Sequence, residues 1–472
     1  MFEDTALIKK KSPIVDRLNA FFDSEYAVGV LAFFALSSAL FGLELYFYSY
    51  ICLAGIYLCL FGRDFRFFVP AALYACVAIS NQNNPNTNPE SVLYPQNGLW
   101  LVIALAVVLA VALVLRGAKL KGEFFRQKRK FLKGFLVLGG AFFISSFMTV
   151  EHILLNLRYS AVLWLSLVAM YYLLTATIDF TSLKKDYFAW VLFFLGLCTS
   201  GQLLEVYLRG NVIVDGQIAR MYISFGWGTY NNLGVMLLVS MPGAFYLAVV
   251  KKRAVIFNLF GNFFYLCLLL SNSRTCMMAG AVVYFICMYF VLREKKNYRQ
   301  NFGVFLTALI LVLIFCVVFN DLVTKIFKEL ITIGAYDSGR WGIYDRGAAQ
   351  FFSSPIFGKG FFASDAYDWW EVAGVNLLPP LWHNTFIQML ASCGFVGLLA
   401  YAYHRVQTFW HFVKNPTVEK TFLGICLLAF LLTNILDCHF FLLGPGLFYS
   451  SFLALTEKDG AGTGLRTLIK NK

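Results

Sequence analysis

Charged residues are scarce in this chain. Only 14% of its 472 residues are Asp, Glu, Lys or Arg, whereas 59% are hydrophobic. A soluble protein of this length could not bury that share of apolar side chains. The composition therefore excludes a water-soluble fold and indicates an all-α protein that crosses a membrane many times. The few charges lie in clusters between apolar runs that are long enough to span a bilayer.

Cysteine and histidine give no sign of a metal site. Most of the 11 cysteines fall inside the apolar runs, and the sequence contains neither a CxxC pair nor the Cys/His spacing of a metal site. We therefore expect no disulfide framework, no metal and no cofactor. The first 25 residues also lack the layout of a cleavable signal peptide.

The apolar runs predict about 12 to 14 transmembrane helices in a single polytopic membrane domain over residues 1–472. Two of the runs are short for a span, which is why the count is a range. The runs are 26–43, 44–61, 67–80, 98–115, 134–150, 157–178, 187–206, 230–250, 254–270, 275–292, 303–319, 383–401, 421–436 and 445–456.

The excess of positive charge reports orientation rather than a partner. The formal net charge is +13. If both termini are cytoplasmic, all but nine of the 39 Lys and Arg residues fall in inner segments, as the positive-inside rule requires. We therefore expect this orientation and no nucleic-acid partner.

The residues best suited to chemistry lie in one large outer loop, predicted at 320–382. It contains Arg340 and Arg346, and His383 follows it at the start of the next span. A cationic site on a membrane surface suits an anionic, lipid-linked substrate. The loop has few helix breakers after Gly342 and predicts a short surface helix, on which the two arginines point in different directions.

His383 is the strongest candidate for catalysis. A lone histidine is more often structural, but this one starts a span beside the arginine-bearing loop. A neutral imidazole can accept a proton from a hydroxyl group near pH 7, and Asn384 or a carboxylate could orient it. Two further outer arginines, Arg220 and Arg274, lie close to spans. Each of them either binds an anion or reaches lipid phosphate from a helix end.

In order and topology these residues resemble the O-antigen ligase and polymerase superfamily of bacterial membrane glycosyltransferases. The resemblance covers about residues 215–400. Upstream, Ser273 and Arg274 match an "SR" pair after a span, and Arg220 precedes an aromatic-Asn helix start. The spacing of Gly394 and Gly397, near the start of a predicted span, is also typical of ordinary packing between membrane helices. The family's later pattern is met by Arg340, Tyr344, Pro355, Gly358, Gly360, His383, Asn384, Gly394 and Gly397.

The resemblance implies a GT-C-like helical fold and a metal-independent, inverting transfer. The donor would be a preassembled glycan on undecaprenyl pyrophosphate, and the acceptor a hydroxyl of lipid A-core or another glycan. The reaction would take place at the outer face of the bacterial inner membrane, among membrane lipids. The resemblance makes His383 the general base and assigns the pyrophosphate to Arg220, Arg274 and Arg340. Arg346, Asn384 and Tyr344 would support them, although Tyr344 stands where relatives often have Trp.

Two alternatives stay open. A polymerase would join one lipid-linked repeat unit to another, and some relatives glycosylate proteins. A transporter or flippase of lipid-linked glycans would belong to a different class, for which internal repeats or intramembrane acids are expected. The sequence shows no convincing repeat, which favours the enzyme.

Overall fold

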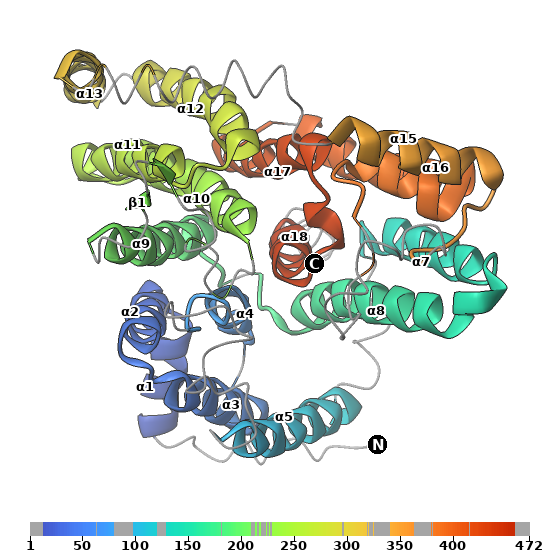
Figure 1. Cartoon of the computed structure of the whole chain (residues 1–472). Helices are drawn as coiled ribbons and strands as arrows, with labels where there is room; N and C mark the ends of the chain where they lie inside the picture. Colours follow the sequence, from blue (N-terminus) through green and yellow to red (C-terminus); the bar gives the residue numbers. More distant parts are fainter. Residues whose placement is uncertain are drawn as a thin grey trace.

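The chain folds as a bundle of α-helices (Figure 1). The computed structural model describes residues 13–62, 64–79, 98–119, 129–180, 182–208, 213–214, 217–218, 223, 226, 229–294, 297–318, 320, 324, 340–362, 379, 381–414 and 416–457. Within these residues, only β1 (Ile213–Val214) and β2 (Gln217–Ile218) are strands. They form an antiparallel pair in which Ile213 is opposite Ile218.

The helices follow one another along nearly the whole described chain. They are α1 (Pro13–Phe22), α2 (Glu25–Phe41), α3 (Glu44–Phe61), α4 (Phe68–Tyr74), α5 (Leu99–Lys119), α7 (Leu132–Ser146), η2 (Val150–His152), α8 (Ile153–Thr177), α9 (Tyr187–Leu208), α10 (Tyr230–Val250), α11 (Ala254–Leu270), α12 (Arg274–Arg293), α13 (Tyr298–Val318), α15 (Arg340–Ser353), α16 (Thr385–Val413), α17 (Val418–Leu436), η8 (His439–Phe441) and α18 (Leu443–Leu455).

Many of these helices have the length and hydropathy of membrane spans. Among the described residues, seven helices pass this test: α3, α8, α9, α10, α12, α16 and α17. The pair α1 and α2 passes it jointly, with a bend of 68°, and α5, α7 and α11 contain shorter apolar helices. The prediction of an all-α polytopic membrane protein is confirmed. The count of about 12 to 14 spans stays a prediction.

Most predicted spans coincide with helices, and three of them match α3, α10 and α11 residue for residue. The run 67–80 is an exception, because it holds only the seven-residue helix α4, which is too short to cross a bilayer. Side chains from α2 and α9 donate hydrogen bonds to backbone carbonyls in the residues that follow α4. Ser38 donates to the carbonyl of Ala78 at 2.9 Å, and Gln202 donates to that of Val77 at 2.8 Å. These bonds satisfy the backbone groups that a continuing helix would have paired.

Helix α10 lies at the centre of the bundle, between α9, α11, α12 and α17 (Figure 1). In the most apolar part of α10, 89% of the residues are buried. The helix carries apolar side chains on all of its faces, so each face can pack against a neighbouring helix. It begins after Thr229, whose hydroxyl accepts the backbone N–H of Asn232. This cap fixes the start of the helix beside the site described below.

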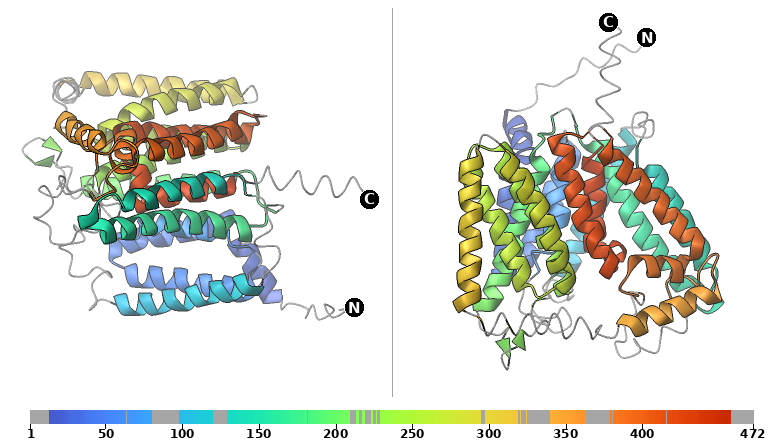
Figure 2. Two further views of the ribbon diagram at one scale, coloured as in Figure 1. Left: turned by 90° about the vertical axis from the view of Figure 1, so that its right-hand side faces the viewer. Right: turned by 90° about the horizontal axis from the view of Figure 1, so that it is seen from above.

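The helices run roughly parallel, so the bundle has two ends (Figure 2). Helix α15 and the β1–β2 hairpin lie at one end, and α1 lies at the other. We refer to these as the α15 end and the α1 end. The starts of α10, α12 and α16 meet the end of α17 at the α15 end, where their polar side chains form hydrogen bonds with one another.

Candidate active site

The α15 end of the bundle holds a histidine–carboxylate pair. His383 precedes α16 and Asp437 follows α17, and the Nδ1 atom of His383 lies 3.1 Å from Oδ1 of Asp437. Because a carboxylate only accepts hydrogen bonds, Nδ1 carries the hydrogen, and the lone pair of the neutral imidazole lies on Nε2. The side chain of His383 is 39% exposed and that of Asp437 only 7%. A buried carboxylate therefore orients an accessible imidazole.

Several donors hold Asp437 in its charged form. The Nδ2 atom of Asn231 donates to Oδ2 at 3.0 Å, and the backbone N–H of Cys438 donates to Oδ1 at 2.8 Å. Burial alone would raise the pKa of Asp437. The charge of His439 and the hydrogen bond from His383 outweigh that effect and hold this pKa well below its usual range. The carboxylate can thus stabilise a positive charge that forms on His383.

His439 is a second, buried histidine beside the same carboxylate. Its Nε2 atom lies 3.8 Å from Oδ2 of Asp437. Burial lowers the pKa of His439, the charge of Asp437 opposes that effect, and the charges of His383 and Arg340 lower it further. The same interactions place Arg340 within electrostatic reach of His439.

The backbone of His383 adopts a left-handed conformation, with φ of 48°. This conformation is uncommon for a residue other than glycine, and such strain concentrates at functional sites. Two neighbours hold it in place. The phenol of Tyr344 donates to the carbonyl of His383 at 3.2 Å. The side chain of Asn384 caps α16 by accepting the N–H of Phe386 and donates to the carbonyl of Ile435, both at 2.8 Å. Tyr344 and Asn384 thus support the backbone, whereas Asp437 orients the ring.

Arg274 and Arg340, two of the predicted pyrophosphate ligands, lie at helix starts at this end. Arg340 is the first residue of α15, Arg274 is the first residue of α12, and both are half-buried. The residue before Arg274 is Ser273, whose hydroxyl donates to Oδ1 of Asn231 at 2.8 Å. Since Asn231 in turn donates to Asp437, hydrogen bonds connect the start of α12 to the histidine–carboxylate pair.

Of the other two candidate arginines, Arg346 and Arg220, the structure describes only Arg346. Arg346 is exposed, and its Nε atom donates to the carbonyl of Gly342 on its own helix at 3.1 Å. Arg220 lies outside the described residues. Within the described part of the chain, no group of three His, Cys, Asp or Glu residues is placed to hold a metal ion.

Helix α16 is broken at Gly394, whose φ and ψ are 63° and −161°. The segment that follows α15 lies in the break. The N–H of Phe395 donates to the carbonyl of Pro355 at 2.9 Å, and the N–H of Gly360 donates to the carbonyl of Ser392 at 2.8 Å. These bonds satisfy backbone groups that the break would leave unpaired, as a membrane interior requires. The expectation that Gly394 serves ordinary helix packing is therefore wrong.

The glycines of this region join α15 to α16. Gly358 and Gly394 both have positive φ, and a Cβ atom on either would collide with the backbone of the opposite segment. Gln350 of α15 adds a hydrogen bond from its Nε2 atom to the carbonyl of Ala391 at 3.0 Å. This joint fixes α15, and with it Arg340 and Tyr344, relative to the start of α16.

The fold and the site together define a helical membrane protein with a histidine–carboxylate pair at one end of its bundle. Residues 259–402 match the family model described as O-antigen ligase. The matched segment runs from α11 into α16 and includes Arg274, Arg340 and His383. A search of curated proteins finds no match for the chain. The family match confirms the resemblance to the O-antigen ligase superfamily over this segment and supports a glycosyltransferase-like activity.

Asp437 was not among the residues predicted from the sequence. It lies 54 positions after His383 and outside the family match, in the short connection between α17 and η8. The sequence left open whether Asn384 or a carboxylate orients the histidine. A single acid at the outer end of a span was the available signal, but only the fold brings it beside His383.

Proposed function

We propose that this protein is an O-antigen ligase-like membrane glycosyltransferase. It transfers a preassembled glycan from undecaprenyl pyrophosphate to a hydroxyl of lipid A-core or of another surface glycan. The reaction takes place at the outer face of the bacterial inner membrane, where the α15 end lies, with both termini cytoplasmic. The observation that carries the proposal is the His383–Asp437 pair at the same end of the bundle as two arginine-bearing helix starts, in a chain whose residues 259–402 match the O-antigen ligase family.

His383 acts as the general base in this proposal. As the acceptor oxygen attacks the anomeric carbon of the donor sugar, its proton passes to Nε2 of His383, and the imidazole becomes positively charged. Asp437, already hydrogen-bonded to Nδ1, stabilises that charge. A positioned base of this kind accelerates a reaction by about 10²- to 10⁴-fold.

The arginines stabilise the leaving group. The bond between the anomeric carbon and the phosphate oxygen breaks as the new glycosidic bond forms on the opposite face, so the configuration inverts. Negative charge grows on the departing undecaprenyl pyrophosphate. Arg274 and Arg340 offer planar guanidinium groups that bind two phosphate oxygens at once, and we assign Arg220 the same role from the sequence. Fixed positive charge at the departing oxygen is often the largest single contribution to catalysis.

A transfer assay on purified protein tests the proposal. The donor is a glycan on undecaprenyl pyrophosphate, the acceptor is lipid A-core, and the readout is the mass of the product. We expect a new glycosidic bond with wild type and its loss with His383→Ala. In proteoliposomes, movement of the lipid-linked glycan without any new glycosidic bond would instead identify a transporter and overturn the proposal.

A polymerase is the alternative within the same superfamily, since the same base and arginines serve whichever hydroxyl attacks. Glycans that accumulate on undecaprenyl pyrophosphate in a deletion strain distinguish the two by mass spectrometry. Long chains indicate the loss of a ligase, as proposed here. Single repeat units indicate the loss of a polymerase.

A further inference from the structure

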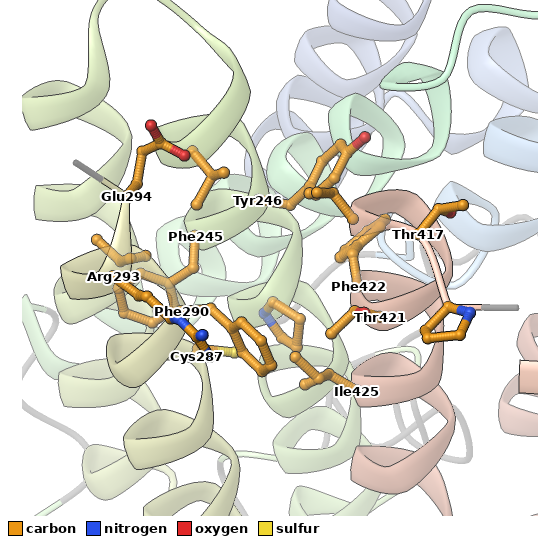
Figure 3. Close-up of a pocket in the computed structure, with 15 residues that line it drawn as sticks. Phe245, Tyr246, Cys287, Phe290, Arg293, Glu294, Thr417, Thr421, Phe422 and Ile425 are labelled. Carbon is orange, nitrogen blue, oxygen red and sulfur yellow. The ribbon is translucent and has the colours of Figure 1, made fainter. Parts of the chain in front are cut away.

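A cavity of about 480 Å³ lies at the ends of α10, α12 and α17 that face away from the His383 site, and Figure 3 shows its lining. It is lined by the second half of α10, the last turns of α12 and the first turns of α17. The His383 site lies at the opposite ends of these same three helices. Since α10 has 21 residues and a helix rises 1.5 Å per residue, roughly 30 Å separates the two ends. The cavity is therefore not part of the site already described.

The interior of the cavity is apolar. Its back wall is formed by α10, where the ring of Tyr246 stacks on that of Phe422 from α17 with 4.4 Å between centroids. Phe245, Val291 and Ile425 cover much of the remaining surface. In Figure 3 Phe245, Phe422 and Ile425 border the space between α12 on one side and α17 on the other. Such a lining suits hydrocarbon and gives a polar metabolite few partners.

The two charged side chains of the lining lie on the α12 side of the cavity, whereas Thr417 and Thr421 lie on the α17 side (Figure 3). Arg293 and Glu294 lie at the end of α12, and Thr417 lies just before α17. Arg293 is exposed and its Nη1 atom donates to the hydroxyl of Tyr289 at 3.0 Å. Phe290, which also lines the cavity, is 38% exposed. The cavity is therefore open at the surface of the bundle, with its charged groups on the α12 side and an apolar interior.

The end of the bundle around these charged groups is basic. Six Lys and Arg residues lie at the adjoining helix ends and connections, against three acidic residues, Asp186, Glu294 and Glu419, and Nζ of Lys251 lies 2.5 Å from Oδ2 of Asp186. The basic residues are Lys251, Lys252, Arg253, Arg293, Lys414 and Lys420. The positive-inside rule assigns this end to the cytoplasmic leaflet, where anionic lipids meet basic residues between membrane helices. An arginine at a helix end is by itself an ordinary anchor. Arg293, however, also borders an apolar cavity large enough to hold a ligand.

We propose that this cavity binds an anionic phospholipid of the cytoplasmic leaflet. One acyl chain occupies the apolar space between α12 and α17, and the phosphate lies at Arg293. An amphiphile matches the arrangement, because its charged head and its hydrocarbon chain meet Arg293 and the apolar interior together. The lipid-linked donor fits less well, since its pyrophosphate has to reach the opposite end of the helices. This inference does not depend on the proposed reaction.

Lipid retention by the full-length protein tests the inference. The detergent-purified protein is delipidated, incubated with phosphatidylglycerol, phosphatidylethanolamine or undecaprenyl phosphate, and examined by native mass spectrometry. We expect one phosphatidylglycerol to be retained in preference to the other two lipids. Arg293→Gln should weaken that retention by about fivefold, the worth of one basic residue at a charged membrane surface.

Two further variants make the outcome decisive. Thr421→Phe places a ring in the cavity from a half-buried position and should reduce retention while leaving thermal stability without added lipid near that of wild type. Arg299→Gln removes an exposed arginine from the start of α13, outside the cavity lining, and should change nothing. Equal retention of the three lipids, preference for undecaprenyl phosphate, or an unchanged preference for phosphatidylglycerol in both cavity variants would overturn the inference.

Discussion

The helices α10, α12 and α17 carry two regions of opposite character at their two ends. At the α15 end, Asn231, Ser273 and Asp437 bind one another and His383 through hydrogen bonds. At the α1 end, the same helices line a largely apolar cavity whose two charged groups, Arg293 and Glu294, lie at the end of α12. Between them the helices are apolar core. The bundle thus separates a polar site suited to chemistry from a site suited to lipid, and the effect of a substitution should depend on the end it alters.

Arginine shows the same dependence on position. Arg405 lies within α16, and its guanidinium carbon is 4.5 to 4.8 Å from the rings of Tyr401, Phe440 and Tyr449. Its three guanidinium nitrogens are buried and have no hydrogen-bond partner among the described residues. Cation–π attraction stabilises such a group, and Phe440 belongs to η8, next to His439. Arg405 therefore packs the core beneath the site, whereas Arg274 and Arg340 are half-buried first residues of helices at the α15 end.

The largest effect is expected at His383. His383→Ala should reduce turnover by about 10²- to 10⁴-fold, because the proton of the acceptor hydroxyl loses its base. Binding of the lipid-linked donor should survive, since the arginines hold the pyrophosphate. His383→Gln should not restore turnover, because an amide accepts a hydrogen bond but takes no proton near neutral pH. Transfer and donor binding are measured on the same purified variants.

His152→Ala is the control, since His152 is the last residue of η2, in the connection between α7 and α8. It should keep near-normal turnover. Loss of donor binding in His383→Ala would make this residue a ligand of the donor, and unchanged turnover would make it structural.

The second effect concerns the joint between α15 and α16. Gly358→Ala should destabilise the protein by roughly 2 to 4 kcal/mol, because positive φ strains alanine and the new Cβ atom meets the backbone of Ser392 and Cys393. Thermal unfolding in detergent measures the change. Gly140→Ala is the control, since a Cβ atom there meets nothing within 4 Å. An equally stable Gly358→Ala variant would show that the segment can leave the break without cost.

This joint also shows how far the sequence could predict the structure. The apolar runs predicted α10 and α11 residue for residue, because hydrophobicity and span length are local properties of the chain. The same pattern placed a span over 383–401 but gave no sign of its break. The backbone groups that form hydrogen bonds with the broken part of α16 belong to residues 355–360. The carboxylate that binds His383 belongs to Asp437. Such pairings depend on packing between distant segments, so periodicity does not reveal them.

The third effect distinguishes phosphate binding from simple charge. Arg274→Lys and Arg340→Lys should each reduce turnover by about 10- to 100-fold, because lysine keeps the charge but loses the planar fork that binds two oxygens, and hydrogen bonds to charged groups are worth about 1.5 to 3 kcal/mol. We expect the same of Arg220→Lys. Arg346→Lys should be mild, given its exposed position. Near-normal rates in the lysine variants of Arg220, Arg274 and Arg340, with normal membrane insertion, would indicate that these arginines only anchor the helices at the membrane surface.

A smaller effect should appear in the pH dependence of stability. The pKa of Asp437 is lower in the folded protein than its usual value of about 3.9. As the pH falls below that value, the unfolded chain binds the proton first, so the folded state loses stability until the pH reaches the folded pKa. Asp437→Asn should be less stable than wild type at neutral pH and should lose less stability on acidification. Thermal unfolding of both proteins between pH 7 and pH 3 measures the difference; parallel curves would show that Asp437 does not contribute.

The smallest expected effect is that of a chelator. In the proposed reaction, arginines rather than a divalent ion neutralise the departing pyrophosphate, so EDTA should leave turnover of the wild type within about twofold. Arg340→Lys sharpens the test, because Mg²⁺ would compensate for a weakened guanidinium contact only if the ion can enter the site and bridge the phosphates. We expect no recovery on adding Mg²⁺ to this variant. Loss of wild-type turnover in EDTA, restored by one divalent ion, would show that a metal ion rather than the arginines neutralises the pyrophosphate. The α15 end would then have to supply oxygen ligands for that metal, and Asp437, a buried acid at that end, could not serve both the ion and His383.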